Sequence, residues 1–242
     1  DRLGAADTYI VATGAGREAS NGRAFAAAVE RATGRRVDVV SGEVEARLTL
    51  RGVRYGLGAL SGLVLTFDIG GGSTEYVLAE GDSIRSMASL RLGVVPLAER
   101  FPFPGPVDAP RYRALCDEIR ARLDGELPTA IRTARVGHLV GTAGTVTTLA
   151  ALDLGLGRYD GARVQGHVLS RAAVDGLAAR LGRLTVAERA ALPCLEPGRA
   201  DLIVPGTAIV TVTMDLARVE RLKVSDYGLR EGLLLEAMEG RS

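Results

Sequence analysis

Residues 63–79 read LVLTFDIGGGSTEYVLA: an apolar run, three glycines bracketed by two acidic residues, and a second apolar run. The residues up to Phe67 are short, apolar and partly β-branched, which is typical of a strand buried on both faces. Asp68 ends this strand, and the second apolar run follows after a short turn. The stretch therefore predicts a β-hairpin with a glycine loop at its tip.

The glycine loop has the chemistry of a phosphate-binding turn. Consecutive glycines can adopt positive φ and present backbone N–H groups to a ligand with no Cβ in the way. Acidic residues at both ends of the loop can hold Mg²⁺, directly or through its water shell. The predicted phosphate-binding residues are Gly70, Gly71, Gly72, Ser73 and Thr74, and the predicted metal ligands are Asp68 and Glu75.

A purely structural interpretation of this stretch is a glycine-rich hairpin with an aspartate cap. The flanking acidic residues favour ligand binding over that interpretation. The spacing matches neither G-x-x-x-x-G-K-[ST] nor G-x-G-x-x-G, and the loop opens onto a strand. P-loop and Rossmann sites are therefore disfavoured.

The composition is that of a globular protein. The chain has 242 residues, 47% of them hydrophobic, and a formal net charge of +1, so it can bury a sizeable core as one or two domains. No apolar run is long enough to cross a bilayer, and the default location is the cytoplasm. The balanced charge argues against a nucleic-acid surface. Cys116 and Cys194 are far apart and are assigned no function.

Upstream of the hairpin, the pattern predicts a strand over 9–13, a helix over 22–33, a strand over 37–40 and a helix over 42–57. Ser20 or Asn21 can cap the first helix and Gly34 can end it, and Phe25, Val29 and Ala32 are expected to face the core. Ser41 is placed as the cap of the second helix. Glu45 lies in its first turn, where the helix dipole alone favours an acid.

Downstream, strands are expected over 83–90, 136–140 and 221–224, and helices over 109–123 and 229–238. A break at 101–106 precedes the first of these helices, and a helical insertion broken by prolines covers about 159–217. The small-residue turn Gly141–Thr145 leads into a helix through about Leu152. It exposes helix N-terminal N–H groups at the end of a strand, so Gly144 and Thr145 are further candidate phosphate-binding residues.

The order of elements suggests a duplication. Residues 61–242 give βββ-α-β-α-insertion-β-α, and residues 1–60 give β-α-β-α, which is the same series without its opening hairpin. We therefore expect an incomplete first domain over 1–60 and a second domain over 61–242, with the last helix packing back on the first domain.

Six motifs in series resemble one family: VAT…REA.N at 11–21, SGE.EAR at 41–47, DIGGGSTE at 68–75, GTAGT at 141–145, RAD…PG at 199–206 and SDYGLREG at 225–232. Together they are similar to the exopolyphosphatase/guanosine pentaphosphate phosphatase family. The resemblance implies an α/β fold of the actin-like ATPase superfamily, with RNase H-like βββαβαβα domains, mixed sheets and an active site in the cleft between the domains.

By this resemblance, Glu45 activates the attacking water, Asp68 and Glu75 organise Mg²⁺ and water, and Arg17 contacts the phosphate chain. The implied substrate is inorganic polyphosphate or guanosine pentaphosphate (pppGpp), with no nucleic-acid or membrane partner; homodimer formation is left open. The family also has a first strand and an Asp-x-Gly-Ser-type loop that would precede Asp1. Without that loop, activity is expected to be impaired.

Two other functions are left open. A nucleotide-binding actin-like ATPase or kinase module would use Gly141–Thr145 for adenosine, but would give Glu45 no obvious purpose. An inactive structural fragment is the other alternative. Charged motif residues outside the loop are interpreted as inter-helix salt bridges: Arg199, Asp201, Arg230 and Glu231. His138 is expected in the core and His167 at the surface.

Overall fold

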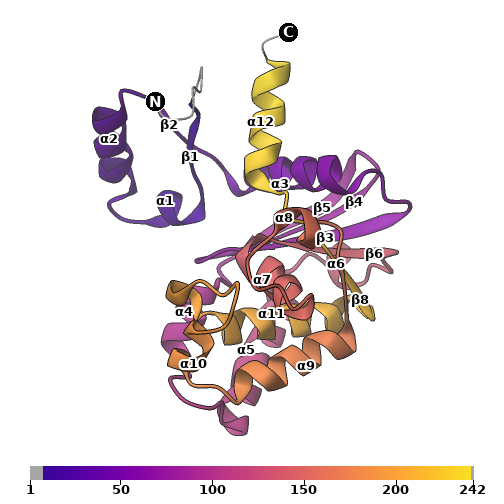
Figure 1. Cartoon of the computed structure of the whole chain (residues 1–242). Helices are drawn as coiled ribbons and strands as arrows, with labels where there is room; N and C mark the ends of the chain where they lie inside the picture. Colours follow the sequence, from indigo (N-terminus) through magenta and orange to yellow (C-terminus); the bar gives the residue numbers. More distant parts are fainter. Residues whose placement is uncertain (1–7, 241–242) are drawn as a thin grey trace.

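The computed structural model describes residues 8–240, without the side chains of Ala15 and Glu18, and places its strands in two sheets (Figure 1). The six-stranded sheet has the order β5-β4-β3-β6-β8-β7. Its strands are β3 (Leu63–Ile69), β4 (Thr74–Glu80), β5 (Ser83–Leu90), β6 (His138–Thr142), β7 (Val168–Ser170) and β8 (Arg221–Val224). The smaller sheet pairs β1 (Ile10–Ala12) with β2 (Val37–Val39) in parallel.

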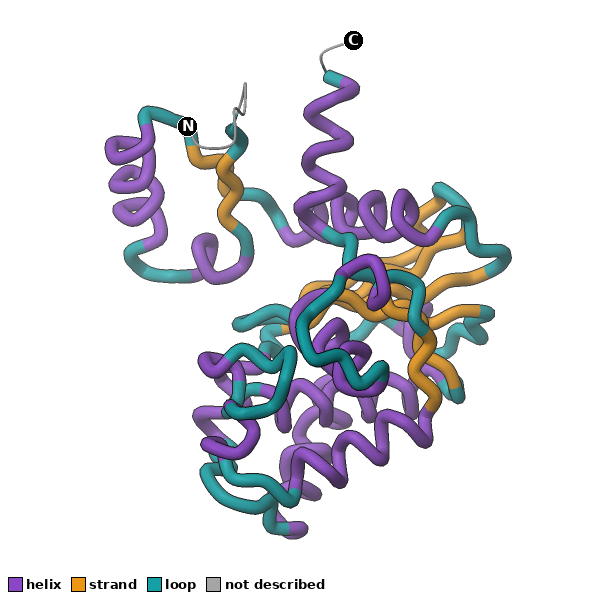
Figure 2. The backbone as a smooth tube through the Cα atoms, viewed as in Figure 1, coloured by secondary structure: helices purple, strands orange, loops and turns teal. Residues whose placement is uncertain are grey.

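Helices cover both faces of the six-stranded sheet. On one face lie α3 (Gly42–Leu57) and α12 (Leu229–Glu239) (Figure 1). On the other lie α4 (Val94–Arg100), α5 (Ala109–Glu126), α7 (Ala143–Asp153), α9 (Arg171–Gly182) and α11 (Ile203–Ala217). The small sheet carries α1 (Gly14–Glu18) and α2 (Gly22–Thr33) and lies to one side (Figure 2). Short connecting helices are α6 (Thr129–Arg132), α8 (Gly161–Val164), α10 (Val186–Ala190) and η1 (Pro197–Arg199).

The hairpin β3–β4 divides its side chains between the two helix layers. Phe67 and Tyr76 are fully buried in the main core with the five-helix layer. Val77 packs on the other face, against Ala46 and Leu50 of α3. Because successive strand residues point to opposite faces, Asp68 and Glu75 point toward the α3 face.

Glycines bring α12 close to α3. A Cβ at Gly52 of α3 would collide with the carbonyl oxygen of Gly228, and a Cβ at Gly232 of α12 would collide with that of Leu48. Only glycine permits this approach of two backbones. The last helix therefore packs on the helix that carries Glu45, while the division into two domains at residue 60 stays a prediction.

Most predicted elements are confirmed, with few shifts at their ends. The hairpin is present, the hydroxyl of Ser41 accepts a hydrogen bond from the N–H of Val44 at the start of α3, and Gly34 ends α2 in the left-handed region at φ 65°. No helix among residues 8–240 is long and apolar enough to span a membrane.

The structure corrects several local predictions. Asn21 is at the N-cap of α2 but its side chain makes no capping bond. Phe25 is 61% exposed, because α2 has only a two-stranded sheet to cover. Helix α4 was not expected, and the predicted helical insertion contains β7, an edge strand too short to show an alternating pattern. Pro205 lies inside the first turn of α11, where proline needs no hydrogen-bond partner, and does not break it.

Candidate active site

Strand register places a row of polar side chains across one end of the six-stranded sheet. Asp68 of β3 is paired with Glu75 of β4, Glu75 with Ser89 of β5, and Asp68 with Thr142 of β6. Directly opposed residues project on the same face, with Cβ atoms about 5 Å apart. The sheet therefore sets two carboxylates side by side, flanked by hydroxyl groups.

Helix α3 brings a third carboxylate to this row. Ala46 and Leu50 pack the helix against the sheet. Glu45 and Thr49 are four residues apart and therefore lie on the same side of the helix. Both are buried. The hydroxyl of Thr49 donates a long hydrogen bond of 3.5 Å to Oδ2 of Asp68, so the face of α3 that carries Glu45 meets the acidic row.

Glu45 has one carboxylate oxygen without a hydrogen bond. Its Oε2 lies 3.7 Å from Nη1 of Arg17 and is buried with no hydrogen-bond partner. Burial raises the pKa of this carboxyl, the charge of Glu75 raises it further, and Arg17 together with hydrogen bonds from Thr13 and Gly14 opposes the rise. A buried carboxylate oxygen that accepts no hydrogen bond, on a group whose pKa is raised, suits a general base.

Asp68 is the most perturbed acid of the site. Burial, followed by the charges of Glu75 and Glu45, raises its pKa from 3.8 to about 7, and the hydrogen bond from Thr49 opposes that rise. The negative charges therefore crowd one another in a poorly solvated place. A cation bound beside Asp68 would favour the ionised carboxylate.

Glu75 is held by two serine hydroxyls. Ser73 donates to its Oε1 at 2.6 Å, and Ser89 donates to the same oxygen at 2.7 Å. Glu75 as a whole residue is only 3% exposed. Ser73 thus contacts the acidic row and does not project as a free donor of the loop.

The glycine loop is shaped differently from the prediction. Gly70, Gly71 and Gly72 are absent from the positive-φ residues; the turn is closed by the N–H of Gly70 donating to the carbonyl of Ser73 at 2.9 Å. The N–H groups of Val94 and Val95 donate hydrogen bonds to the carbonyl oxygens of Gly70 and Gly71, respectively. A Cβ at Gly72 would meet no atom within 4 Å. Local packing does not require glycine there, whereas close approach of a ligand would.

Thr74 does not belong to the assembled site. Its side chain is fully buried, and its hydroxyl donates to the carbonyl oxygen of Leu92 at 2.6 Å. The predicted role of this hydroxyl in phosphate binding is replaced by a link between the hairpin and the chain that follows β5. Strand alternation explains the outcome, because Thr74 and Glu75 point to opposite faces.

The turn at Gly141–Thr145 lies beside the glycine loop. Strand β6 runs directly into α7 through Ala143, which has φ 68°. A cavity of about 350 Å³ is lined by Gly70 and Gly71 on one side and by Gly144 and Thr145 on the other. The structure therefore brings together two predicted phosphate-binding segments that are separated by 70 residues of chain.

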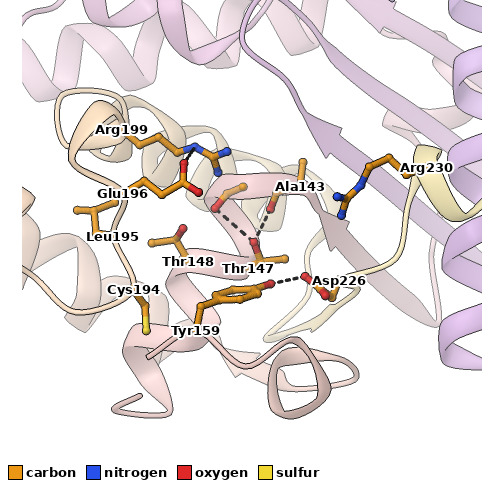
Figure 3. A pocket seen from close by; sticks show the side chains of 11 residues that line it. Ala143, Thr147, Thr148, Tyr159, Cys194, Leu195, Glu196, Arg199, Asp226 and Arg230 are labelled. Carbon is orange, nitrogen blue, oxygen red and sulfur yellow. Dashed lines mark hydrogen bonds and ion pairs between the residues drawn. The ribbon is translucent and has the colours of Figure 1, made fainter. Parts of the chain in front are cut away.

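A larger pocket of about 580 Å³ continues from this cavity, sharing Gly144 and Arg199 with it (Figure 3). Tyr159 donates a hydrogen bond to Asp226 at the pocket wall, and the hydroxyl of Thr147 also lines it. A Cβ at Gly144 would collide with the guanidinium of Arg199, so the arginine lies directly against the first turn of α7.

Sequence reasoning missed the place of two arginines. The sequence predicts that Arg199 and Arg230 bridge helices, but their ion pairs are local, with Glu196 at 2.9 Å and Glu231 at 3.8 Å. Both line the larger pocket, on either side of the start of α7 (Figure 3). Their motifs were visible in the sequence, but nothing in the spacing showed which cavity they would face.

The donor set fits a cation held partly by substrate. Within residues 8–240, no group of three His, Cys, Asp or Glu side chains could hold a metal ion alone. Mg²⁺ usually keeps several waters and is bound through one or two carboxylates plus substrate phosphates. Asp68 and Glu75, which are paired in the sheet, match that pattern.

Comparison with known proteins gives a consistent result. The model of the Ppx/GppA phosphatase family matches residues 1–240. Exopolyphosphatase 2 of Mycobacterium tuberculosis is 34% identical over 239 residues, covering 93% of this chain and 73% of that protein. Exopolyphosphatase 1 of Mycobacterium leprae is 29% identical, covering 99% and 70%.

Solved structures agree with the sequence relatives. An exopolyphosphatase from Cytophaga hutchinsonii superposes with a TM-score of 0.89 at 26% identity, covering 99% of this chain and 77% of that one. The Aquifex aeolicus member of the Ppx/GppA family superposes with a TM-score of 0.85 at 33% identity, covering 97% and 74%. The predicted fold class is thereby confirmed: a mixed-sheet α/β fold of the actin-like ATPase superfamily.

Proposed function

Because this chain belongs to the Ppx/GppA phosphatase family, we propose that it releases the terminal phosphate of inorganic polyphosphate by attack of a water molecule that Glu45 activates. The observation that carries the proposal is the buried Oε2 of Glu45, which accepts no hydrogen bond and lies against the acidic row. A buried acceptor without a donor is costly, and a water molecule bound there would satisfy it.

The chemistry is an in-line displacement. Glu45 accepts a proton from the water as the water oxygen bonds to the terminal phosphorus. The bridging P–O bond breaks, and its electron pair leaves with the shortened polyphosphate chain. An anhydride oxygen is a good leaving group, so the site mainly has to position the reactants and balance charge.

The other residues divide the remaining tasks. Arg17, near Glu45, brings positive charge to the site and would contact a non-bridging phosphate oxygen. A Cβ at Gly72 would meet no atom within 4 Å, so a phosphoryl group can approach the loop there and accept hydrogen bonds from its backbone N–H groups. Asp68 and Glu75 would hold Mg²⁺, which supplies positive charge for the equatorial oxygens when bound.

The test is phosphate release from linear polyphosphate by the full-length protein, measured with malachite green in the presence of Mg²⁺. We expect steady release of orthophosphate and loss of activity with EDTA. Absence of release from polyphosphate, together with thermal stabilisation by ATP, would instead support the nucleotide-binding module.

A second candidate substrate, pppGpp, is favoured by the pocket of about 580 Å³ at the start of α7, which continues from the cavity at the glycine loop. Its wall combines the ring of Tyr159 with two arginines and two acids, a neutral and partly aromatic lining that suits a nucleoside better than further phosphates. Replacement Tyr159→Ala is expected to lower kcat/KM for pppGpp about tenfold, since stacking of a base on an aromatic ring contributes about 1–3 kcal/mol.

The same replacement is expected to change kcat/KM for polyphosphate by less than about twofold, because a linear chain would not stack on the ring. Arg135→Ala, at an exposed position outside both pockets, serves as the control. Steady-state kinetics with both substrates make the comparison. Equal losses of kcat/KM for the two substrates would contradict the placement of the nucleoside in this pocket.

A further inference from the structure

Ser89 lies outside every motif that pointed to the site, yet it contacts a site carboxylate. Its hydroxyl donates to Oε1 of Glu75 at 2.7 Å, and Ser73 donates to the same oxygen at 2.6 Å. The two serines therefore turn one oxygen of the carboxylate toward themselves and leave the other for a different partner.

The position of Ser89 connects Glu75 to the start of α3. Ser89 is opposite Glu75 in the β4–β5 ladder, and its Cβ would lie 3.2 Å from a Cβ on Gly42, the first residue of α3. Glu45 follows one turn later. In the same way, the Oγ of Ser73 would lie 3.1 Å from a Cβ on Gly14. Both serines thus lie between the acidic row and the N-terminal elements.

We infer that Ser89 is a positioning residue, which orients Oε2 of Glu75 toward the divalent cation used with polyphosphate. This inference rests on the proposed function and its cation. Hydrogen bonds that orient a metal-binding carboxylate commonly change metal affinity by about 10- to 100-fold when removed. Because Ser73 still holds Oε1 in a Ser89 variant, the loss is expected at the lower end.

The experiment titrates Mn²⁺ alone into the protein and measures free metal by EPR. Ser89→Ala is expected to weaken Mn²⁺ binding about tenfold, and Ser89→Thr, which keeps the hydroxyl, is expected to restore it. Ser86→Ala, on the same strand and without a side-chain hydrogen bond among the described residues, is the control and should bind like wild type. Circular dichroism confirms that each variant is folded.

Phosphate release from polyphosphate supplies an independent readout. The kcat of Ser89→Ala should return to the wild-type value at saturating Mg²⁺, because the defect lies in metal affinity. Wild-type Mn²⁺ affinity in folded Ser89→Ala, or no recovery in Ser89→Thr, would overturn the inference. If wild type releases phosphate but binds no Mn²⁺, this inference fails while the hydrolase survives; if wild type binds Mn²⁺ but releases no phosphate, the hydrolase itself fails.

Discussion

Glu45→Gln is expected to lower kcat for phosphate release from polyphosphate by about 1,000-fold, within the range that removal of a general base usually produces. The amide keeps the volume of the side chain but cannot accept the proton of the attacking water. KM is expected to change by less than about threefold, because an interaction made only in the transition state affects kcat and kcat/KM alike. Stopped-time assays with malachite green give both constants.

The same helix provides a matched control for this variant. Glu43 also lies in the first turn of α3, but it is exposed, so Glu43→Gln removes an equal charge from the same helix end. We expect wild-type kinetics for Glu43→Gln. If Glu45→Gln releases phosphate as fast as wild type, Glu45 is not the base and the mechanism proposed for this site is wrong.

Asp68→Asn is expected to increase stability at alkaline pH while it lowers activity. The pKa of Asp68 is raised to about 7 by burial and by the charges of Glu75 and Glu45. Between the usual pKa of 3.8 and about 7, the folded state holds a proton that the unfolded state releases. Stability therefore falls as pH rises through this window, and the full cost is present above it.

Replacement of the Asp68 carboxylate by an amide should remove most of the free-energy cost of ionising this buried group. At pH 8 we expect the free energy of unfolding of Asp68→Asn to exceed that of wild type by about 2–4 kcal/mol, and at pH 4 we expect the two to agree within about 0.5 kcal/mol. Urea melts at pH 4, 6 and 8 measure the difference. Asp124→Asn, at an exposed position, should show no such pH dependence. A difference that is equal at all three pH values would show that charge at Asp68 is not its cause.

Much of the fold follows from local patterns. The alternation of apolar runs and glycines predicted the hairpin, the Ser41 cap predicted the start of α3, and both acids of the loop were found from their place beside the glycines. These signals are local because hydrogen bonding in a turn or a helix cap involves residues only a few positions apart. The serial motifs added the family, and with it the role expected of Glu45.

Local sequence patterns could not predict which of these residues come together in the site. Ser89, Glu75 and Asp68 form a row only because strand register aligns them, and Thr74 leaves the site because its neighbour Glu75 enters it. Arg199 lines the pocket because η1, the short helix that carries it, packs beside the start of α7. No short sequence pattern predicts this packing. In this protein, the sequence by itself determines which chemical group stands at each position and the local turns and helix ends. The face on which each side chain lies, its neighbours and its solvation are decided by packing between residues far apart in the chain. Those three properties raise the pKa of Asp68 and leave Oε2 of Glu45 without a hydrogen-bond donor.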